Sequence, residues 1–185
     1  MKKFYTRMAL LLMFVISGEM VKAQYFEKGT KVIEAGVQLQ SEYVPFVVNF
    51  EAGVTDQIGI GLKGFVGSMK GNSFDKYNLS ALQLVGTYHL NDQISLPMEN
   101  LDVYGGIGIG ILNIKTTIDL FGATYSESDK GFLITPHFGA RYYFSDNIGI
   151  NARVGMDIYK IQLYDTILYK TMKKPNLAIG VTFRF

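Results

Sequence analysis

The strongest constraint on the fold is an alternation of apolar and polar residues that returns eight times along the chain. Side chains in an extended strand point alternately to opposite faces, so this period of two gathers the apolar residues on one face of each strand. The eight alternating runs span residues 33–40, 46–54, 58–63, 82–90, 101–111, 132–144, 148–158 and 176–185. The sequence therefore predicts an all-β fold, an eight-stranded antiparallel up-and-down transmembrane β-barrel.

The connections between these runs differ at the two ends of the predicted barrel. A near-repeat, with the forms DQIGI, DQISL and DNIGI, begins at Asp56, Asp92 and Asp146 and marks turns at one end. The segments expected at the opposite end are mostly longer and more polar, and we predict them to be loops: 41–45, 69–79, 121–131 and 165–175. Short turns at one end and long loops at the other are typical of outer-membrane barrels, whose short turns lie in the periplasm.

The alternation changes parity at two places. After residues 110–113 the apolar residues Ile114, Ile118 and Leu120 are even-numbered, and a similar change follows Tyr159. Each change indicates either a β-bulge or the point where the strand leaves the membrane.

Residues 1–23 have the pattern of a secretory signal peptide. Lys2, Lys3 and Arg7 precede a short apolar run, MALLLMFVIS, and small residues at positions 21 and 23 precede Gln24. That run is about half the roughly 20 residues of a spanning helix, which disfavours an uncleaved anchor. We expect residues 1–23 to be removed and residues 24–185 to form one barrel domain. The chain has no cysteine and a net charge of +2, which gives no indication of nucleic-acid binding.

The distribution of charge favours a barrel whose apolar face meets lipid. Lys or Arg on that face at mid-membrane would cost about 2–4 kcal/mol, and the eight apolar faces are nearly free of charge. The alternative, a soluble lipocalin-like barrel with its apolar face inward, would expose a glycine-rich and weakly charged surface. We expect a polar network in the lumen, formed by Glu34, Glu51, Lys63, Asp102, His137, Arg141, Arg153, Asp157 and Arg184. Aromatic rings of lipid-facing parity predict girdles at the two membrane boundaries, formed by Phe46, Tyr88, Phe132 and Phe144.

The final run, LAIGVTFRF, alternates apolar residues and closes on Phe183 and Phe185. In this respect the chain resembles the single-domain outer-membrane β-barrel proteins, similar in plan to the transmembrane part of outer-membrane protein A and to the opacity proteins. The resemblance covers residues 24–185. It implies a place in the outer membrane of a Gram-negative bacterium, contact with outer-membrane lipid and lipopolysaccharide, and insertion by the barrel-assembly machinery, with Phe183 and Phe185 as the signal. The peptidoglycan-binding domain of some relatives is not found in the sequence.

Three functions remain open from the sequence. The first is a structural or surface-interaction barrel, in which the lumen charges form an ion-pair network that fixes the interior. The second is a narrow channel, in which the same charges line a path for ions or small solutes. The third, an outer-membrane lipid-modifying enzyme, is disfavoured because His89 and His137 have no identifiable nucleophile or metal-ligand partners in the sequence. We therefore predict no catalytic residue, cofactor or metal, and Lys170, Lys173 and Lys174 remain candidates for contact with lipopolysaccharide phosphates.

Overall fold

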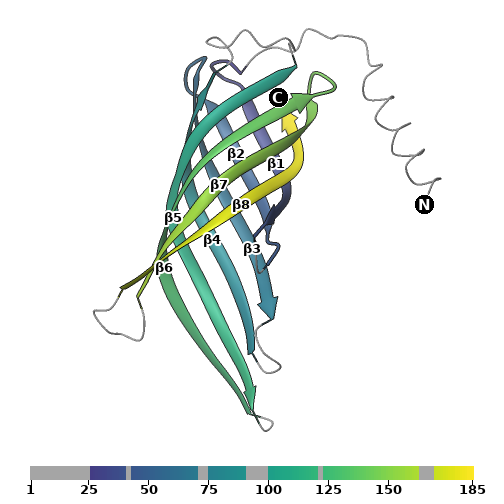
Figure 1. The fold of residues 1–185 in the computed structure, drawn as a ribbon. Helices are drawn as coiled ribbons and strands as arrows, with labels where there is room; N and C mark the ends of the chain where they lie inside the picture. The colour runs from purple at the N-terminus through teal and green to yellow at the C-terminus, as the bar shows by residue number, and fades with distance from the viewer. Residues whose placement is uncertain (1–25, 41–42, 71–74, 91–99, 121–122, 163–168) are drawn as a thin grey trace, which may run out of the picture.

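The chain folds into a closed barrel of eight antiparallel strands, in which each strand pairs with its sequence neighbours and the first pairs with the last (Figure 1). The computed structural model describes residues 26–40, 43–70, 75–90, 100–120, 123–162 and 169–185. The strands are β1 (Lys31–Leu39), β2 (Phe46–Gly53), β3 (Ile58–Lys70), β4 (Asp75–His89), β5 (Leu101–Leu120), β6 (Ala123–Tyr143), β7 (Ile148–Gln162) and β8 (Tyr169–Arg184). The expected eight-stranded up-and-down barrel is confirmed, whereas the predicted signal peptide lies outside the described residues.

The two ends of the barrel differ as the turn pattern predicts. At one end, Val54 N–H donates to the Ile58 carbonyl at 2.8 Å and Phe144 N–H donates to the Ile148 carbonyl at 3.1 Å, closing tight turns. The C-terminus lies at this same end (Figure 1). The third predicted turn, at residues 92–96, falls outside the described residues. We call the end with the tight turns the turn end and the opposite end the hairpin end.

The strands run further at the hairpin end than the sequence predicts. The ladder between β3 and β4 continues to Lys70↔Lys76, and the ladder between β5 and β6 continues to Leu120↔Ala123. The prediction of loops is therefore wrong for residues 69–70, 75–79, 123–131 and 169–175, which lie in strands, while residues 71–74, 121–122 and 165–168 fall outside the described part of the chain. Beyond the membrane both faces of a hairpin meet water, so backbone pairing persists there without the alternation that marks a strand in the sequence.

The predicted β-bulges are absent from the described strands. β5 keeps one continuous register with β6 from Leu101↔Tyr142 to Leu120↔Ala123, and β7 keeps one with β8 from Ile148↔Phe183 to Gln162↔Tyr169. The change of parity has another cause: Ile114 has the lumen-facing parity of β5 and packs against a cluster of buried apolar residues. The bulge interpretation is therefore wrong at both places.

The two faces of the sheet have opposite chemistry. Large apolar side chains point outward and are exposed, as at Ile111 (68%) and Leu84 (65%), while the inward faces bury charged residues completely, as at Arg141 (0%). This arrangement contradicts the soluble alternative, in which the apolar residues would fill the interior. The described residues contain no helix with the length and apolar character needed to cross a bilayer.

Candidate functional site: the lumen of the barrel

Inward-facing glycines make room for large polar side chains in the lumen. A Cβ atom added at Gly139 would lie 2.4 Å from Cζ of Tyr104, and one added at Gly106 would lie 2.8 Å from Nε2 of His137. Real Cβ atoms do not approach other atoms this closely. The alternate glycines of β5 therefore serve the packing of a narrow barrel.

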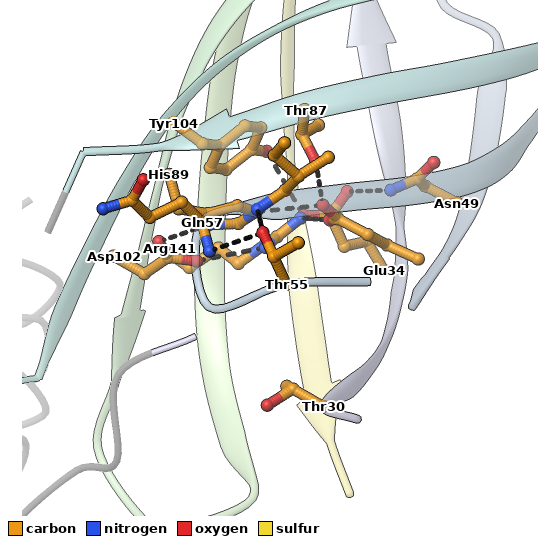
Figure 2. Close-up of polar contacts among 12 residues, drawn as sticks. Thr30, Glu34, Asn49, Thr55, Gln57, Thr87, His89, Asp102, Tyr104 and Arg141 are labelled. Carbon is orange, nitrogen blue, oxygen red and sulfur yellow. Dashed lines mark hydrogen bonds and ion pairs between the residues drawn. The ribbon is translucent and has the colours of Figure 1, made fainter. Parts of the chain in front are cut away.

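Arg141 on β6 is the centre of a buried ionic cluster near the turn end. Its Nε donates to Glu34 Oε1 at 2.7 Å, its Nη1 donates to Asp102 Oδ2 at 3.1 Å, and its Nη2 donates to Glu51 Oε2. The guanidinium carbon also lies 4.2 Å from the centre of the Tyr104 ring, a cation–π distance. Figure 2 shows dashed lines joining the members of this cluster across the lumen, so one cation links strands β1, β2 and β5 to β6.

His89 completes the cluster from β4. Its Nδ1 lies 2.7 Å from Asp102 Oδ1 and its Nε2 lies 3.0 Å from Glu51 Oε1, so the ring bridges two of the carboxylates that contact Arg141. Phe26, which precedes β1, stacks on one face of this ring, with centroids 3.5 Å apart and planes 3° apart. Phe26 is only 4% exposed and covers the ionic cluster at the turn end of the lumen.

A second polar cluster surrounds Asp157 on β7. Its carboxylate accepts hydrogen bonds from Gln38 Nε2 at 2.9 Å, from Thr135 Oγ1 at 2.6 Å, and from Gln40 Nε2. The Tyr159 hydroxyl lies 3.3 Å from the same carboxylate. No arginine or lysine forms an ion pair with Asp157 among the described residues, so neutral donors satisfy this buried carboxylate.

Between the two clusters lies a short basic section with incomplete hydrogen bonding. Lys63 Nζ, Arg153 Nε and His137 Nε2 are buried and have no hydrogen-bond partner within the described part of the chain. Arg153 reaches Glu34 through Nη1 at 3.6 Å. A cavity beside Arg153 and Asn49 has a volume of about 10 Å³, roughly the room for one water molecule.

An apolar layer closes the lumen above the polar clusters, toward the hairpin end. It consists of buried side chains from six strands: Val47, Phe65, Leu112, Leu133, Tyr159 and Ala178. Ile114 and Met172 pack against it. From the turn end toward the hairpin end, the described lumen is thus filled by the Phe26 ring, the ionic cluster around Arg141, the basic section, the polar cluster around Asp157 and the apolar layer.

The structure brings most of the predicted network residues together and separates one of them. Glu34, Glu51, Asp102 and Arg141 form the ionic cluster, while Lys63, His137, Arg153 and Asp157 lie deeper in the lumen, and all eight are buried. Arg184 instead lies at the mouth of the turn end, where Nε and Nη2 donate to the Asp146 carbonyl at 3.1 and 2.7 Å. Parity alone predicts Arg184 in the network, and that prediction is wrong because the residue lies next to the chain end, at the mouth of the barrel.

The predicted girdle and assembly residues all point away from the lumen. The four girdle rings, Phe46, Tyr88, Phe132 and Phe144, are 42–50% exposed. Phe183 and Phe185 are 43% and 60% exposed on the closing strand and at its end. These positions place apolar rings on the outer wall near both ends of the apolar band.

Sequence reasoning missed Phe26 and the role of His89. Phe26 precedes the first alternating run, so no periodicity marks it as buried. His89 has lumen-facing parity and could have been included on that signal alone. The partners Thr87 and Tyr104 also have inward parity; the Thr87 hydroxyl donates to Glu51, and the Tyr104 hydroxyl donates to Glu34 at 3.3 Å.

The chemistry available to these residues is ion pairing and hydrogen bonding. His89 contacts two carboxylates, and His137 Nδ1 lies 3.1 Å from the Thr135 carbonyl, so within the described part of the chain neither ring is hydrogen-bonded to a serine or threonine hydroxyl. A nucleophile activated by histidine requires such a contact. No group of three or more metal-binding side chains occurs among the described residues.

Comparison with known proteins gives a family and a fold. The family described as "Outer membrane protein beta-barrel domain" matches residues 9–185. Among solved structures, the N-terminal barrel domain of Pseudomonas aeruginosa OprF has a TM-score of 0.51 at 18% identity, covering 85% of this chain and 98% of that chain. Neisserial surface protein A has a TM-score of 0.57 at 12% identity, covering 84% of this chain and 96% of that chain.

The attachment invasion locus protein Ail of Yersinia pestis has a TM-score of 0.52 at 14% identity, covering 85% of this chain and 99% of that chain. Identities this low support a shared fold alone. No curated protein sequence matches the chain.

Proposed function

Because the chain belongs to the outer membrane protein beta-barrel domain family, and thus to the Gram-negative outer membrane, we propose that it is a closed barrel with a structural or surface-interaction role. In this role the filled barrel is an anchor, and the strand extensions at the hairpin end are the part that meets the cell exterior. Membrane residence follows from the family, whereas the role of the barrel is what we propose.

The single observation that carries the proposal is the filled lumen. An eight-stranded barrel is just wide enough for side chains to fill it, and here a salt-bridged arginine and an apolar layer occupy the same axis. A solute would have to displace Arg141 from its carboxylates and then pass Leu112 and Leu133, which are about 1% exposed or less. Breaking a buried ion pair costs several kcal/mol, which opposes spontaneous opening.

The long β5–β6 hairpin is the feature best suited to surface contact. Its strands pair up to Leu120↔Ala123, and residues 124–128 are exposed. Backbone pairing holds such a hairpin in a defined position, so its side chains meet a partner with little loss of conformational freedom. Among the structural neighbours, the name of Ail describes attachment and invasion, and that name supports a similar use of these extensions here.

Cysteine labelling of intact cells tests the predicted surface exposure. The chain has no cysteine, so single substitutions at Ser126 in the hairpin and Ser145 in a tight turn provide a matched pair. A membrane-impermeant maleimide should label Ser126→Cys in intact cells and should label Ser145→Cys only after lysis. Labelling of the turn and protection of the hairpin would reverse the orientation and remove the surface role.

A narrow channel remains the second candidate, favoured by one observation. Several buried polar atoms along the lumen, among them Lys63 Nζ, Gln83 Oε1 and Asn151 Oδ1, have no partner within the described residues. Buried polar groups without protein partners are commonly bound by water, and a row of waters would be the beginning of a polar path. Conductance measurements separate the two candidates, as described below.

The remaining expected roles are part of the same proposal. We infer that the outward rings anchor the barrel at the two membrane boundaries and that Phe183 and Phe185 are read during insertion by the barrel-assembly machinery. Their exposure on the outer wall supports both roles. A lipid-modifying activity is not proposed, and unchanged lipid A mass spectra after deletion and overexpression of the gene would agree with that position.

A further inference from the structure

The lipid-facing wall of the barrel is hollowed over strands β2 to β6. A groove of about 600 Å³ lies there, between outward ridges that include Phe46, Leu82 and Ile111. Gly64 interrupts the row of large side chains, and a Cβ added to it would meet only the Ala81 carbonyl oxygen, at 3.7 Å. The groove therefore exists because a small residue occupies an outward position where the neighbouring strands carry large ones.

The groove continues toward the hairpin end and meets lysines there. A second hollow of about 450 Å³ shares Val66, Ser80 and Asn113 with the first. Lys130 lines the first hollow and Lys115 lines the second. The strand register makes these lysines diagonal neighbours on the same face, because Lys115 pairs with Ser128, two residues from Lys130.

A third lysine extends this group across β4. Lys76 pairs with Thr117, two residues beyond Lys115, and all three lysines are exposed on the outward face. Glu127 and Asp129 of β6 have the opposite, lumen-facing parity. The outward face above the groove thus carries a concentration of positive charge.

Along their strands, the lysines lie just beyond the band of exposed apolar side chains, toward the hairpin end. Lys130 is two residues beyond the exposed Phe132, and Lys115 is four residues beyond the exposed Ile111. At about 3.3 Å per residue along a strand, the lysines lie roughly 7–13 Å past the last large apolar side chains. Lipid headgroups occupy this level, and acyl chains occupy the level of the groove.

We propose that this groove holds an acyl chain of a phosphorylated glycolipid of the lipid A class, whose phosphate groups lie against Lys76, Lys115 and Lys130. The site is separate from the lumen and does not depend on whether the barrel conducts. The expected contact with lipopolysaccharide then occurs at this groove on the lipid-facing wall.

A third hollow, on the opposite wall, provides an internal comparison. It is lined by small and apolar residues of β1, β5, β6, β7 and β8, including Ala35 and Ala152, and no charged side chain lines it. An acyl chain gains no hydrophobic free energy on entering either hollow, because the surrounding lipid tails are equally apolar. Selective retention of one lipid therefore requires the lysines, and the two connected hollows over β2 to β6 have Lys130 and Lys115 among their lining residues.

Two pairs of variants separate the proposed site from general lipid contact. Gly64→Leu fills the groove, whereas Gly86→Leu adds the same side chain at another outward glycine of the wall, with nothing within 4 Å of its Cβ. Lys115→Ala with Lys130→Ala removes the charge above the groove, whereas Lys31→Ala removes an exposed outward charge on β1 at the turn end, away from the groove-lining residues. The matched variants keep any effect on folding distinguishable from an effect on binding.

Native mass spectrometry of the folded full chain in detergent, with diphosphoryl lipid A as the probe, tests the proposal. The wild type and the controls Gly86→Leu and Lys31→Ala should retain one lipid A molecule. Each lysine near a lipid surface contributes about fivefold to binding, so the double lysine variant should bind about 25-fold more weakly, and Gly64→Leu should also lose the lipid.

Three results would overturn the proposal. Equal retention by all variants would mean annular lipid without a site, and equal retention of phosphatidylglycerol would mean that the glycolipid is not selected. Dimers of the wild type that Gly64→Leu abolishes, without bound lipid A, would assign the groove to a second copy of the chain. None of these results bears on conductance, so the proposed function is tested independently.

Discussion

Replacement of Arg141 by methionine tests whether the ionic cluster holds the barrel interior together. Methionine approximates the length of the arginine stem but leaves Glu34, Glu51 and Asp102 without their common cation. Removing one partner of a buried ion pair costs about 3–5 kcal/mol. Because Arg141 is 0% exposed and serves three carboxylates, we expect a loss at the upper end, about 5 kcal/mol in the free energy of unfolding.

The assay is urea unfolding of barrel refolded into lipid vesicles, followed by the mobility of unboiled samples in SDS gels and by circular dichroism. Lys63→Met is the matched control, because Lys63 is equally buried but its ammonium has no hydrogen-bond partner among the described residues. That control should change the free energy of unfolding by no more than about 1 kcal/mol. A loss below about 1 kcal/mol for Arg141→Met, or equal losses for both variants, would refute the reasoning.

Three further predictions concern the packing and assembly of the barrel. Gly139→Ala should destabilise the barrel by about 1–3 kcal/mol in the same assay because its Cβ meets Tyr104, whereas Gly86→Ala should be nearly neutral. Phe26→Ala should lower the free energy of unfolding by about 2 kcal/mol through lost burial and should speed hydrogen exchange of the His89 amide, and unchanged exchange would show that the ring does not cover the cluster. Phe185→Ala, which keeps the backbone hydrogen bonds to Lys31, should reduce the amount of folded barrel in outer-membrane fractions with little change in the unfolding of molecules that do fold, which separates assembly from stability.

The sequence predicted the strand order and the lumen lining because both depend on the same period of two. Parity alone placed Glu34, Glu51 and Arg141 inside the barrel, and a small barrel brings inward charges close enough to pair. It did not predict which carboxylates share Arg141. The choice of carboxylates depends on strand register and tilt, which bring together residues that are far apart in the sequence, such as Glu34 and Arg141.

Other features had no signal in the sequence. β5 extends to residue 120 and β6 begins at residue 123, where the two strands still pair through their backbones. Both faces of this part of the hairpin meet water, so apolar and polar residues need not alternate there. Phe26 is buried by stacking on His89 and precedes every alternating run. The groove beside Gly64 depends on five neighbouring strands at once, so no single run of residues indicates it.

Planar-bilayer recording of the purified, refolded full chain is the most direct test of the central claim that the lumen is closed. Two features close the lumen: Arg141, which is bound to three carboxylates, and the apolar layer above it. We expect no discrete openings for the wild type at moderate voltage. Stable unit currents in the wild type, with an ion selectivity that changes in Arg153→Ala, would contradict the claim and identify the chain as a channel.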